Sequence, residues 1–303
     1  MFSAGGEIRT REPLRDRILS PDQRRIEIEK NRFIFSESDI QEFLNRLKAS
    51  GRSDLRIQEL KNGLKRFGET VNWDCKLTDI TEYIDNRRKE VSNVTLTKDI
   101  QMIKQFLKDQ NIEWGKKIKR PTIERKKPKI VNKEDIIQLI NKLKEVDVEQ
   151  KYFYRAKTAI ILSAVSGMRP WEIYRLNWED IDLENRIINL PAKKTKTREE
   201  RTVIFNKEAQ THLKNHKKNF PNQAFNKKTI YTLTNKINPK PETKLKHCRK
   251  YFSQQWDRQG LPTSIKEMLM GHFGTIDLTN YNNQTPENLK KIYDKANLKI
   301  TEQ

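Results

Sequence analysis

Apolar residues between positions 36 and 110 recur at the spacing of helix faces. The first segment follows the cap signal Ser36-Glu37-Ser38-Asp39 and has apolar residues at i, i+3, i+4 and i+7, namely Ile40, Phe43, Leu44 and Leu47. Three similar segments begin at Ser53-Asp54, Thr78-Asp79 and Thr97, which we interpret as helix starts. Four short amphipathic helices predict a small helical bundle over residues 36–115.

Beyond residue 130 the helical pattern returns in longer and more apolar segments. An apolar run over residues 156–166 ends at Gly167, which suits a helix C-terminus, and Pro170 suits the first turn of the next helix. Other helices are predicted around residues 136–143, 209–217, 245–260 and 264–269, and from Pro286 onward.

Two segments within this second region follow the period of a strand instead. Residues 186–190 and 201–205 alternate between apolar and polar side chains, and the polar segment 193–200 between them is the predicted tip of a hairpin. Residues 130–303 are therefore expected to form a mainly α-helical domain with one small antiparallel sheet.

Basic residues and prolines separate the two regions. Residues 116–129 hold three pairs of adjacent basic residues, and Pro121 and Pro128 interrupt any helix there. We interpret this segment as a linker, which either follows a phosphate backbone or serves as a plain solvated hinge. Residues 1–35 are polar and charged without sustained periodicity, which indicates a flexible arm.

The charge balance of the chain favours a polyanionic partner. Its 303 residues include 62 Lys and Arg against 41 Asp and Glu, a formal net charge of +21. A surplus of this size attracts nucleic acid and releases counterions on binding. A thermophile's charge-rich surface would explain the charged fraction of 34% but not the imbalance. Basic residues on the outer faces of the predicted bundle are then expected to contact DNA phosphates.

Other classes of function find little support in the sequence. Cys75 and Cys248 stand far apart, without metal-ligand spacing or a disulfide framework, so a reducing cytoplasm is expected. No apolar run approaches the ~18 residues of a membrane span, and the N-terminus lacks an apolar signal core. Four histidines, no dense carboxylate cluster and no Walker-type glycine loop disfavour a metal-dependent nuclease or an ATPase. We expect a soluble protein that needs no cofactor and no membrane.

Arginine, lysine, histidine and tyrosine occur in a fixed order in the second half of the chain, in residues 167–172, 246–249 and 269–272 and at Tyr281. Arg249 and His272 lie 23 positions apart, and His272 and Tyr281 lie 9 apart. Cleaving a phosphodiester needs a nucleophile, a proton donor for the leaving oxygen and positive charge around the phosphorus. This set resembles the catalytic boxes of the tyrosine recombinases, the phage-integrase family. The resemblance covers about residues 130–300, with a looser likeness to the family's SAM-like core-binding domain over 36–120.

The resemblance implies roles for the cationic residues. Arg169 and Arg249 resemble the two arginines of the family's active site, and Glu172 would be the buried support of the first. Lys246 stands where most members have histidine, which leaves its acid–base role open. His272 matches the family's second histidine.

The resemblance also implies a nucleophile and a general acid. Tyr281 resembles the nucleophile, whose phenol needs surrounding cations because its ordinary pKa is near 10. The family's general acid is a lysine at the tip of the two-stranded hairpin. Counting back from residues 203–205 favours Lys196, with Lys194 as the second candidate.

Two residues near these boxes are not assigned to the catalytic set. Tyr293 is the rival nucleophile, but it lies 21 positions from His272, which does not fit the family's spacing. His247 would face about 100° away from Lys246 on a helix, and we interpret it as structural.

The final helix, from Pro286, either packs on its own core or docks on a neighbouring protomer.

By this resemblance the chain is expected to be a site-specific recombinase, an integrase of an archaeal virus or plasmid. It would cut each strand through a 3′-phosphotyrosyl intermediate, without metal or ATP. We expect double-stranded DNA as its partner, a homotetramer on the synapsed DNA, a monomer in solution and a cytoplasmic, nucleoid-associated location. The alternatives are a chromosome-dimer resolvase or type IB topoisomerase-like enzyme, and a non-catalytic DNA-binding protein of the same fold.

Overall fold

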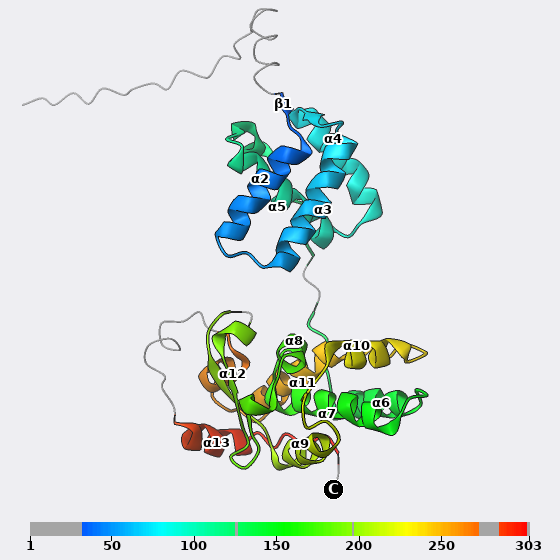
Figure 1. Ribbon diagram of the computed structural model, residues 1–303, viewed down its shortest axis with the longest axis vertical. Helices are drawn as coiled ribbons and strands as arrows, with labels where there is room; N and C mark the ends of the chain where they lie inside the picture. The colour runs from blue at the N-terminus through cyan, green and yellow to red at the C-terminus, as the bar shows by residue number, and fades with distance from the viewer. Residues whose placement is uncertain (1–31, 125–126, 196, 273–284, 302–303) are drawn as a thin grey trace, which may run out of the picture. The chain divides into compact units, whose positions relative to one another are not determined.

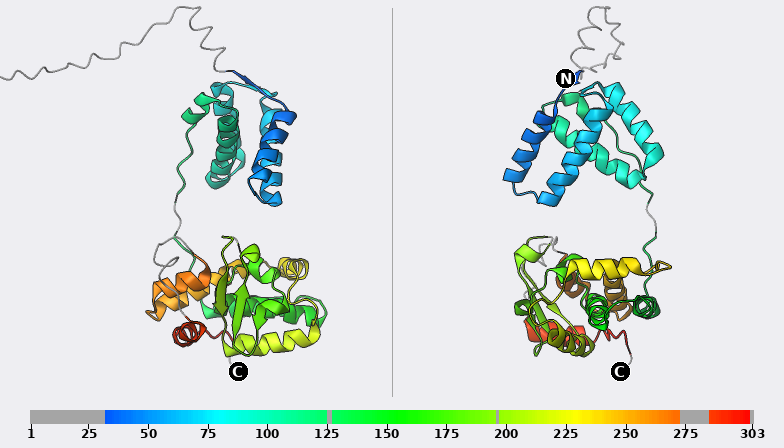
Figure 2. Two further views of the ribbon diagram at one scale, coloured as in Figure 1. Left: turned by 60° about the vertical axis from the view of Figure 1, so that its left-hand side comes forward. Right: turned by 45° about the vertical axis from the view of Figure 1, so that its right-hand side comes forward.

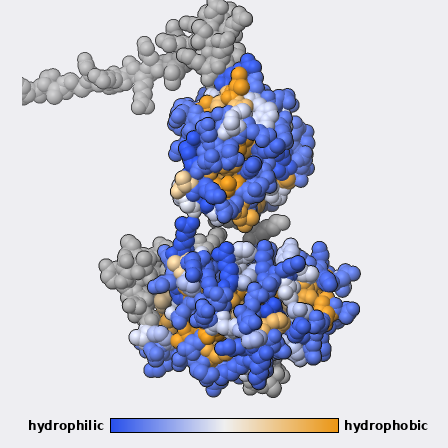
Figure 3. Space-filling model, viewed as in Figure 1, coloured by the Kyte–Doolittle hydropathy of each residue, from blue (hydrophilic) through white to orange (hydrophobic). Residues whose placement is uncertain are grey.

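The computed structural model describes residues 32–124, 127–195, 197–272 and 285–301 (Figure 1). The chain divides into two compact units, residues 1–126 and 127–303, each with its own hydrophobic core. Within the described ranges, no helix combines the length and the apolar character that crossing a membrane requires. The surface of both units is largely hydrophilic, with scattered apolar patches (Figure 3).

The first unit is the predicted four-helix bundle. Its helices are α2 (Glu37–Ala49), α3 (Asp54–Thr70), α4 (Leu77–Glu90) and α5 (Asn93–Asp109), followed by the 3₁₀ turn η1 (Glu113–Lys117). The apolar faces meet in one core of aromatic and aliphatic side chains, among them Phe43, Leu64, Phe67, Ile100 and Phe106. The amphipathic periodicity could predict this bundle because each helix buries one stripe of its surface.

Two predicted helix starts in this bundle are wrong by a few residues. Helix α5 begins at Asn93, because the Ser92 hydroxyl caps it, and Thr97 lies inside the helix with Oγ1 donating to the Asn93 carbonyl over 2.8 Å. Helix α4 begins at Leu77, and Asp79 is its third residue, where the carboxylate accepts from the Lys76 N–H over 2.8 Å. An Asp in the first turn of α4 and a Thr inside α5 thus gave the same sequence signal as an N-cap residue.

The first unit includes residues that the sequence analysis assigned to the N-terminal arm. Strand β1 (Phe33–Ile34) pairs antiparallel with β2 (Asp74–Cys75), and the Phe35 ring is 4% exposed and stacks on Phe67. Residues 33–35, assigned to the N-terminal arm, therefore belong to the first unit, because their aromatic side chains complete its core. Residues 1–31 of the predicted arm lie outside the described residues.

The beginning of the predicted linker also belongs to the first unit. Trp114 and Ile118 are buried in its core, and the Lys104 ammonium donates to the carbonyls of Lys116 and Ile118. Val131 is fully buried in the core of the second unit. The segment that joins the two cores is therefore shorter than the predicted residues 116–129.

The second unit is built around one buried helix, α7 (Gln150–Ser166), which starts six residues before the apolar run that predicted it. Figures 1 and 2 show the surrounding helices, and α6, α9, α10 and α11 pack directly on α7. The other helices of the unit are α6 (Lys133–Lys144), α8 (Pro170–Tyr174), α9 (Lys207–Asn219), α10 (Lys227–Lys236), α11 (Leu245–Arg258), α12 (Thr263–Met270) and α13 (Pro286–Asp294).

The predicted hairpin is present and gains a third strand. Strands β3 (Ile181–Asp182), β4 (Ile187–Leu190) and β5 (Arg201–Ile204) form an antiparallel sheet in that order. Two 3₁₀ turns flank it, η2 (Trp178–Asp180) and η3 (Ala192–Lys194). Strand β5 packs against α12 and α13, which places the hairpin beside the Gly-His segment that follows α12. The mainly α fold with a small antiparallel sheet is confirmed.

The C-terminal segment packs on its own unit. In α13, Leu289 and Tyr293 are buried, and further along Ile300 is fully buried. The Glu208 carboxylate accepts from the Ile300 N–H over 2.9 Å and from the Thr301 N–H over 2.7 Å. Of the two alternatives for the final helix, packing on its own core is the arrangement that this structure has.

Candidate active site

A sharp turn between two helices positions Arg169. Helix α7 ends at Gly167, whose φ of +66° lies in the left-handed region that favours glycine. A Cβ there would also lie 2.6 Å from the ring of Phe252, so a larger residue does not fit. Arg169 is then the N-cap of α8, and Pro170 fills the first position, where a missing N–H costs nothing.

Glu172, three residues after Arg169, lies at the centre of a cluster of arginine side chains. Its carboxylate is fully buried and accepts from the Arg169 backbone N–H at 2.9 Å and from Arg169 Nη1 at 3.0 Å. Arg201 binds it in a forked arrangement, with Nη1 at 3.0 Å and Nη2 at 2.6 Å. Burial alone would raise the pKa of Glu172, but the hydrogen bonds and charge of Arg201, aided by Arg169, outweigh burial and lower it.

Arg201 is a residue of this cluster that the sequence did not single out. Its side chain is 1% exposed and its Nε donates to the Leu269 carbonyl at 3.1 Å. Gly271 follows α12 with a φ of +66°, and a Cβ there would lie 2.8 Å from Arg201 Nη1. The glycine of the Gly-His segment therefore serves two purposes, since it ends α12 and leaves room for the Arg201 guanidinium.

Arg249 brings a third guanidinium to the cluster from α11. Its Nη1 donates to the Gly167 carbonyl at 2.5 Å, and its Nη2 donates to the Met270 carbonyl at 2.8 Å. Burial, and then the nearby charge of Arg169, lower the pKa of the Arg249 guanidinium below its ordinary value. Two guanidinium groups thus bind the buried Glu172 carboxylate and a third lies close by, so the cluster carries a net positive charge that an anion would neutralise.

His272 joins the cluster through Arg249. Its Nε2 lies 2.7 Å from Arg249 Nη2, and its Nδ1 lies 2.5 Å from Glu267 Oε2. A guanidinium only donates hydrogen bonds, so Nε2 accepts and the Nδ1–H of a neutral ring donates to Glu267. Glu267 therefore holds the imidazole in one orientation, a role that the sequence did not assign to it.

Lys246 and His247 occupy the first turn of α11. Lys246 is exposed, one turn before Arg249. His247 Nδ1 accepts from the Lys244 N–H at 3.2 Å and thereby caps the helix, which is a structural role.

The two predicted residues with the most direct chemistry, Lys196 and Tyr281, lie outside the described residues. The second candidate for general acid, Lys194, forms an ion pair with Asp180, and both side chains are nearly buried, at 12% and 11% exposed. This ion pair holds Lys194 against η2 and disfavours it as a proton donor to DNA.

The rival nucleophile Tyr293 lies in the core. Its side chain is 2% exposed, its hydroxyl donates to the Val165 carbonyl at 2.6 Å, and burial raises its pKa well above the ordinary value. A hydroxyl enclosed in this way cannot meet a DNA phosphate, and the geometry agrees with the spacing argument against Tyr293.

The Glu172 cluster leads to a prediction about stability. Changing Glu172→Gln should lower the free energy of unfolding by about 3 kcal/mol, because it leaves buried guanidinium groups without a counter-charge. Denaturant unfolding measures this loss. Glu184→Gln, which removes one partner of an exposed ion pair with Lys214, is the control and should cost much less.

The pH dependence of this loss follows from the lowered pKa of Glu172. Its stabilising effect is fully present above the pKa of an unfolded glutamate, about 4.3, and is lost as the pH falls through the lower folded value. The stability gap between the wild type and Glu172→Gln should therefore narrow below about pH 4. A gap that stays constant down to acid pH would show that the Glu172 charge is not what stabilises the cluster.

Comparison with known proteins adds a family and a fold to this geometry. Residues 129–288 match the family model described as Phage integrase family. The fold resembles a lambda integrase dimer bound to a core site (10% identity over 82% of this chain and 98% of the other, TM-score 0.63). It also resembles the Tn1549 transposon integrase in complex with circular intermediate DNA (18% identity over 84% and 97%, TM-score 0.59). The search of curated proteins gave no match. Because the family model spans more than half of the sequence, the chain belongs to the phage integrase family, the tyrosine-type site-specific recombinases.

Proposed function

We propose that the cationic cluster of Arg169, Arg201 and Arg249 is built to receive the phosphate that the recombinase cleaves, and that Tyr281 attacks it. The observation that supports this is the charge of the cluster, three guanidinium groups against the carboxylates of Glu172 and Glu267. Arg169 and Arg249 would offer the non-bridging oxygens those N–H donors that their present contacts with backbone carbonyls and with Glu172 leave free. Arg201 would remain on Glu172, because its side chain is only 1% exposed and its two Nη groups both donate to that carboxylate.

The reaction proceeds by exchange of one ester for another. Tyr281 gives up its phenolic proton and its oxygen bonds to phosphorus as the bond to the 5′ oxygen breaks, giving a 3′-phosphotyrosyl ester. Lys196 supplies the proton that the leaving 5′ oxygen takes up. His272, held by Glu267, accepts from Arg249 and so positions the guanidinium that binds the phosphate. Attack by the 5′-hydroxyl of another strand reverses the chemistry without external energy.

Lys246 takes the position of the usual family histidine in this proposal. Its ammonium stands on the same α11 face as Arg249, one turn earlier, and is exposed. We assign it a charge contact to a phosphate oxygen rather than acid–base chemistry.

The first unit is the proposed core-binding domain. Several of its basic side chains already form ion pairs with acidic residues of the same unit. The Lys65 ammonium lies 2.8 Å from Glu37, and Arg66 and Arg87 both pair with Asp99. Phosphate contacts from these residues would require an exchange of partners. The net charge of +21 over the whole chain still favours the duplex as partner.

The wider setting is part of the same proposal. Lambda integrase forms a tetramer on a Holliday junction, in a structure that resembles this chain with a TM-score of 0.63 and 12% identity over 90% of this chain and 86% of the other. We propose the same homotetramer on synapsed DNA for this chain, with a monomer in solution, a cytoplasmic location at the nucleoid and an origin in an archaeal virus or plasmid.

Trapping the covalent intermediate tests the proposal. The protein should form an SDS-resistant adduct with a pool of nicked duplexes of random core sequence, and the trapped DNA can be sequenced to read the target. Adduct formation should persist in excess EDTA without nucleotide. Loss of the adduct on adding EDTA would contradict the metal-free mechanism.

The same assay separates the alternatives. A non-catalytic DNA-binding protein of this fold would form no adduct at all. A topoisomerase-like enzyme would form adducts without an enriched core sequence and would relax supercoiled plasmid.

A further inference from the structure

A pocket of about 210 Å³ opens next to the cationic cluster, where α8, α10 and the start of α11 meet. Its wall contains the side chains of Pro170, Tyr174, Tyr231 and Leu245. The volume is below the roughly 300–1,000 Å³ of typical small-molecule sites. It therefore suits a single planar ring rather than a larger ligand.

Two tyrosines give this pocket an aromatic character. Tyr231 of α10 is 57% exposed, which is unusual for so large a ring, and Tyr174 of α8 is half-buried. Both side chains line the pocket, and burial, followed by the nearby Tyr231, raises the pKa of Tyr174 to about 12. An exposed aromatic ring beside a second ring offers a stacking surface for a nucleobase.

The pocket also has a buried polar group that is not satisfied. Thr243 is 3% exposed and lines the pocket, and its hydroxyl has no hydrogen-bond partner among the described residues. Buried hydroxyls in proteins are nearly always hydrogen-bonded, because leaving one unpaired is costly. The Thr243 oxygen is itself covered, so the side chain must rotate before a donor or acceptor on the edge of a ligand can supply the missing partner.

Three lysines line the pocket, and two of its lining residues are close neighbours of active-site arginines in the sequence. Lys240, Lys244 and Lys246 all line it. Pro170 follows Arg169 directly, and Lys246 lies one helical turn before Arg249.

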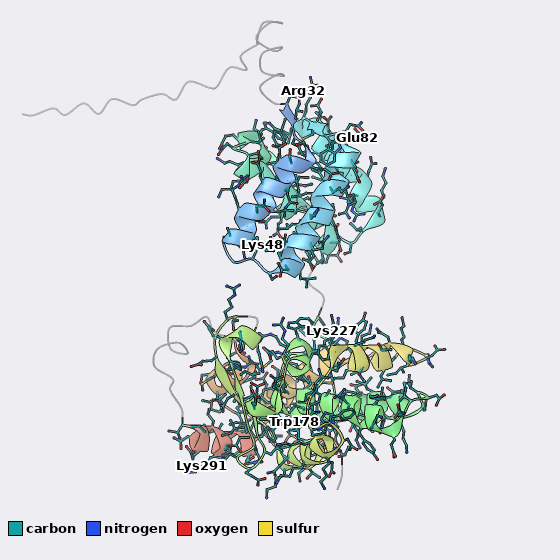
Figure 4. The ribbon with its side chains drawn as sticks, viewed as in Figure 1. Arg32, Lys48, Glu82, Trp178, Lys227 and Lys291 are labelled. Atoms are coloured by element: carbon teal, nitrogen blue, oxygen red, sulfur yellow. The ribbon has the colours of Figure 1, made fainter. Side chains whose placement is uncertain are left out.

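A further cation is fixed nearby. The Lys227 ammonium lies 4.8 Å from the ring centre of Trp171, which the Arg175 guanidinium also covers at 4.7 Å. Figure 4 shows Lys227 at the first turn of α10. Helix α10 is thus tied to α8 on a positively charged surface.

We infer that this pocket receives one unstacked base of the DNA strand whose phosphate lies in the cationic cluster. The inference rests on the proposed function, since it places the base beside the cleaved phosphate. The tyrosine rings stack on the base, the Thr243 hydroxyl bonds its edge, and the lysines hold the flanking phosphates. A phosphate alone would leave the aromatic wall unused. An apolar protein side chain would leave Thr243 unpaired and would not need the lysines.

A pair of oligonucleotides of equal length tests the inference without knowledge of the target site. The probes are a short oligothymidylate and an abasic strand with the same number of phosphates. The wild type should bind oligothymidylate more tightly, and Tyr231→Ala should reduce this preference at least about fivefold, the usual scale for one stacked base. Tyr231→Phe keeps a ring and should retain the preference.

Tyr154→Ala is the matched control, because Tyr154 is an exposed tyrosine of the same unit that does not line the pocket. It should leave the preference unchanged. The inference fails if Tyr231→Ala weakens both strands equally, or neither of them.

Thr243→Val gives a readout that a purely structural threonine would not give. Removing an unpaired buried hydroxyl should leave the melting temperature equal to or above that of the wild type, yet lower the preference for oligothymidylate over the abasic strand. A lower melting temperature with an unchanged preference would show that Thr243 serves the fold and would overturn the inference.

These results can be separated from those that bear on the reaction itself. If the covalent adduct forms but Tyr231→Ala has no base-dependent effect, the pocket inference fails and the recombinase mechanism stands. If the base preference depends on Tyr231 but no adduct forms, the pocket stands and the assignment of Tyr281 chemistry fails.

Discussion

Tyr281→Phe should abolish the covalent protein–DNA adduct while leaving DNA affinity unchanged. The substitution removes only the phenolic oxygen, which is the atom that would bond to phosphorus in the proposed reaction. The fall in strand cleavage should therefore reach the detection limit of the assay. Cleavage of the trapped duplex pool and its equilibrium binding are measured side by side.

Tyr293→Phe is the matched control for this experiment. Its hydroxyl donates to the Val165 carbonyl inside the core, so its loss should cost some stability and leave adduct formation intact. If Tyr293→Phe loses the adduct while Tyr281→Phe keeps it, the assignment of the nucleophile is wrong.

Lys196→Ala should slow cleavage of an ordinary phosphodiester by about two to four orders of magnitude, the usual contribution of a general acid. A substrate with a 5′-bridging sulfur should be affected much less, because a thiolate leaves without being protonated. Single-turnover cleavage rates are measured on both substrates for the wild type and the variant. A fall in rate that is large on the phosphodiester and small on the sulfur substrate shows that the lysine is a proton donor.

Lys194→Ala is the control for the position of the general acid. Lys194 is paired with Asp180, so its loss should slow both substrates by the same modest factor, through a less well held hairpin. Rescue by sulfur in Lys194→Ala, without rescue in Lys196→Ala, would place the proton donor two residues earlier.

Local features of the fold could be predicted from the sequence because short-range chemistry determines them. The helix that begins after Ser36 has its apolar stripe, its capping hydroxyl and its N3 carboxylate within a few residues. The turn at Gly167 and Pro170 is equally local. Helix α10 was missed because only Ile230 and Leu233 are buried in a segment rich in threonine and lysine.

Long-range pairs in the site could not be predicted in this way. Arg201 reaches Glu172 across 29 positions, and nothing in the basic segment around it distinguishes this arginine from a solvated one. Glu267 likewise has no motif of its own, although it orients His272. The roles of Lys196 and Tyr281 rest on family resemblance and on the proposal above.

The most direct test of the mechanism is to identify the residue that carries the DNA. The trapped adduct is digested with nuclease and protease, and the nucleotide-bearing peptide is sequenced by mass spectrometry. We expect a nucleotide joined through its 3′-phosphate to Tyr281. A nucleotide on any other residue, or one joined through its 5′-phosphate, would contradict the proposed reaction.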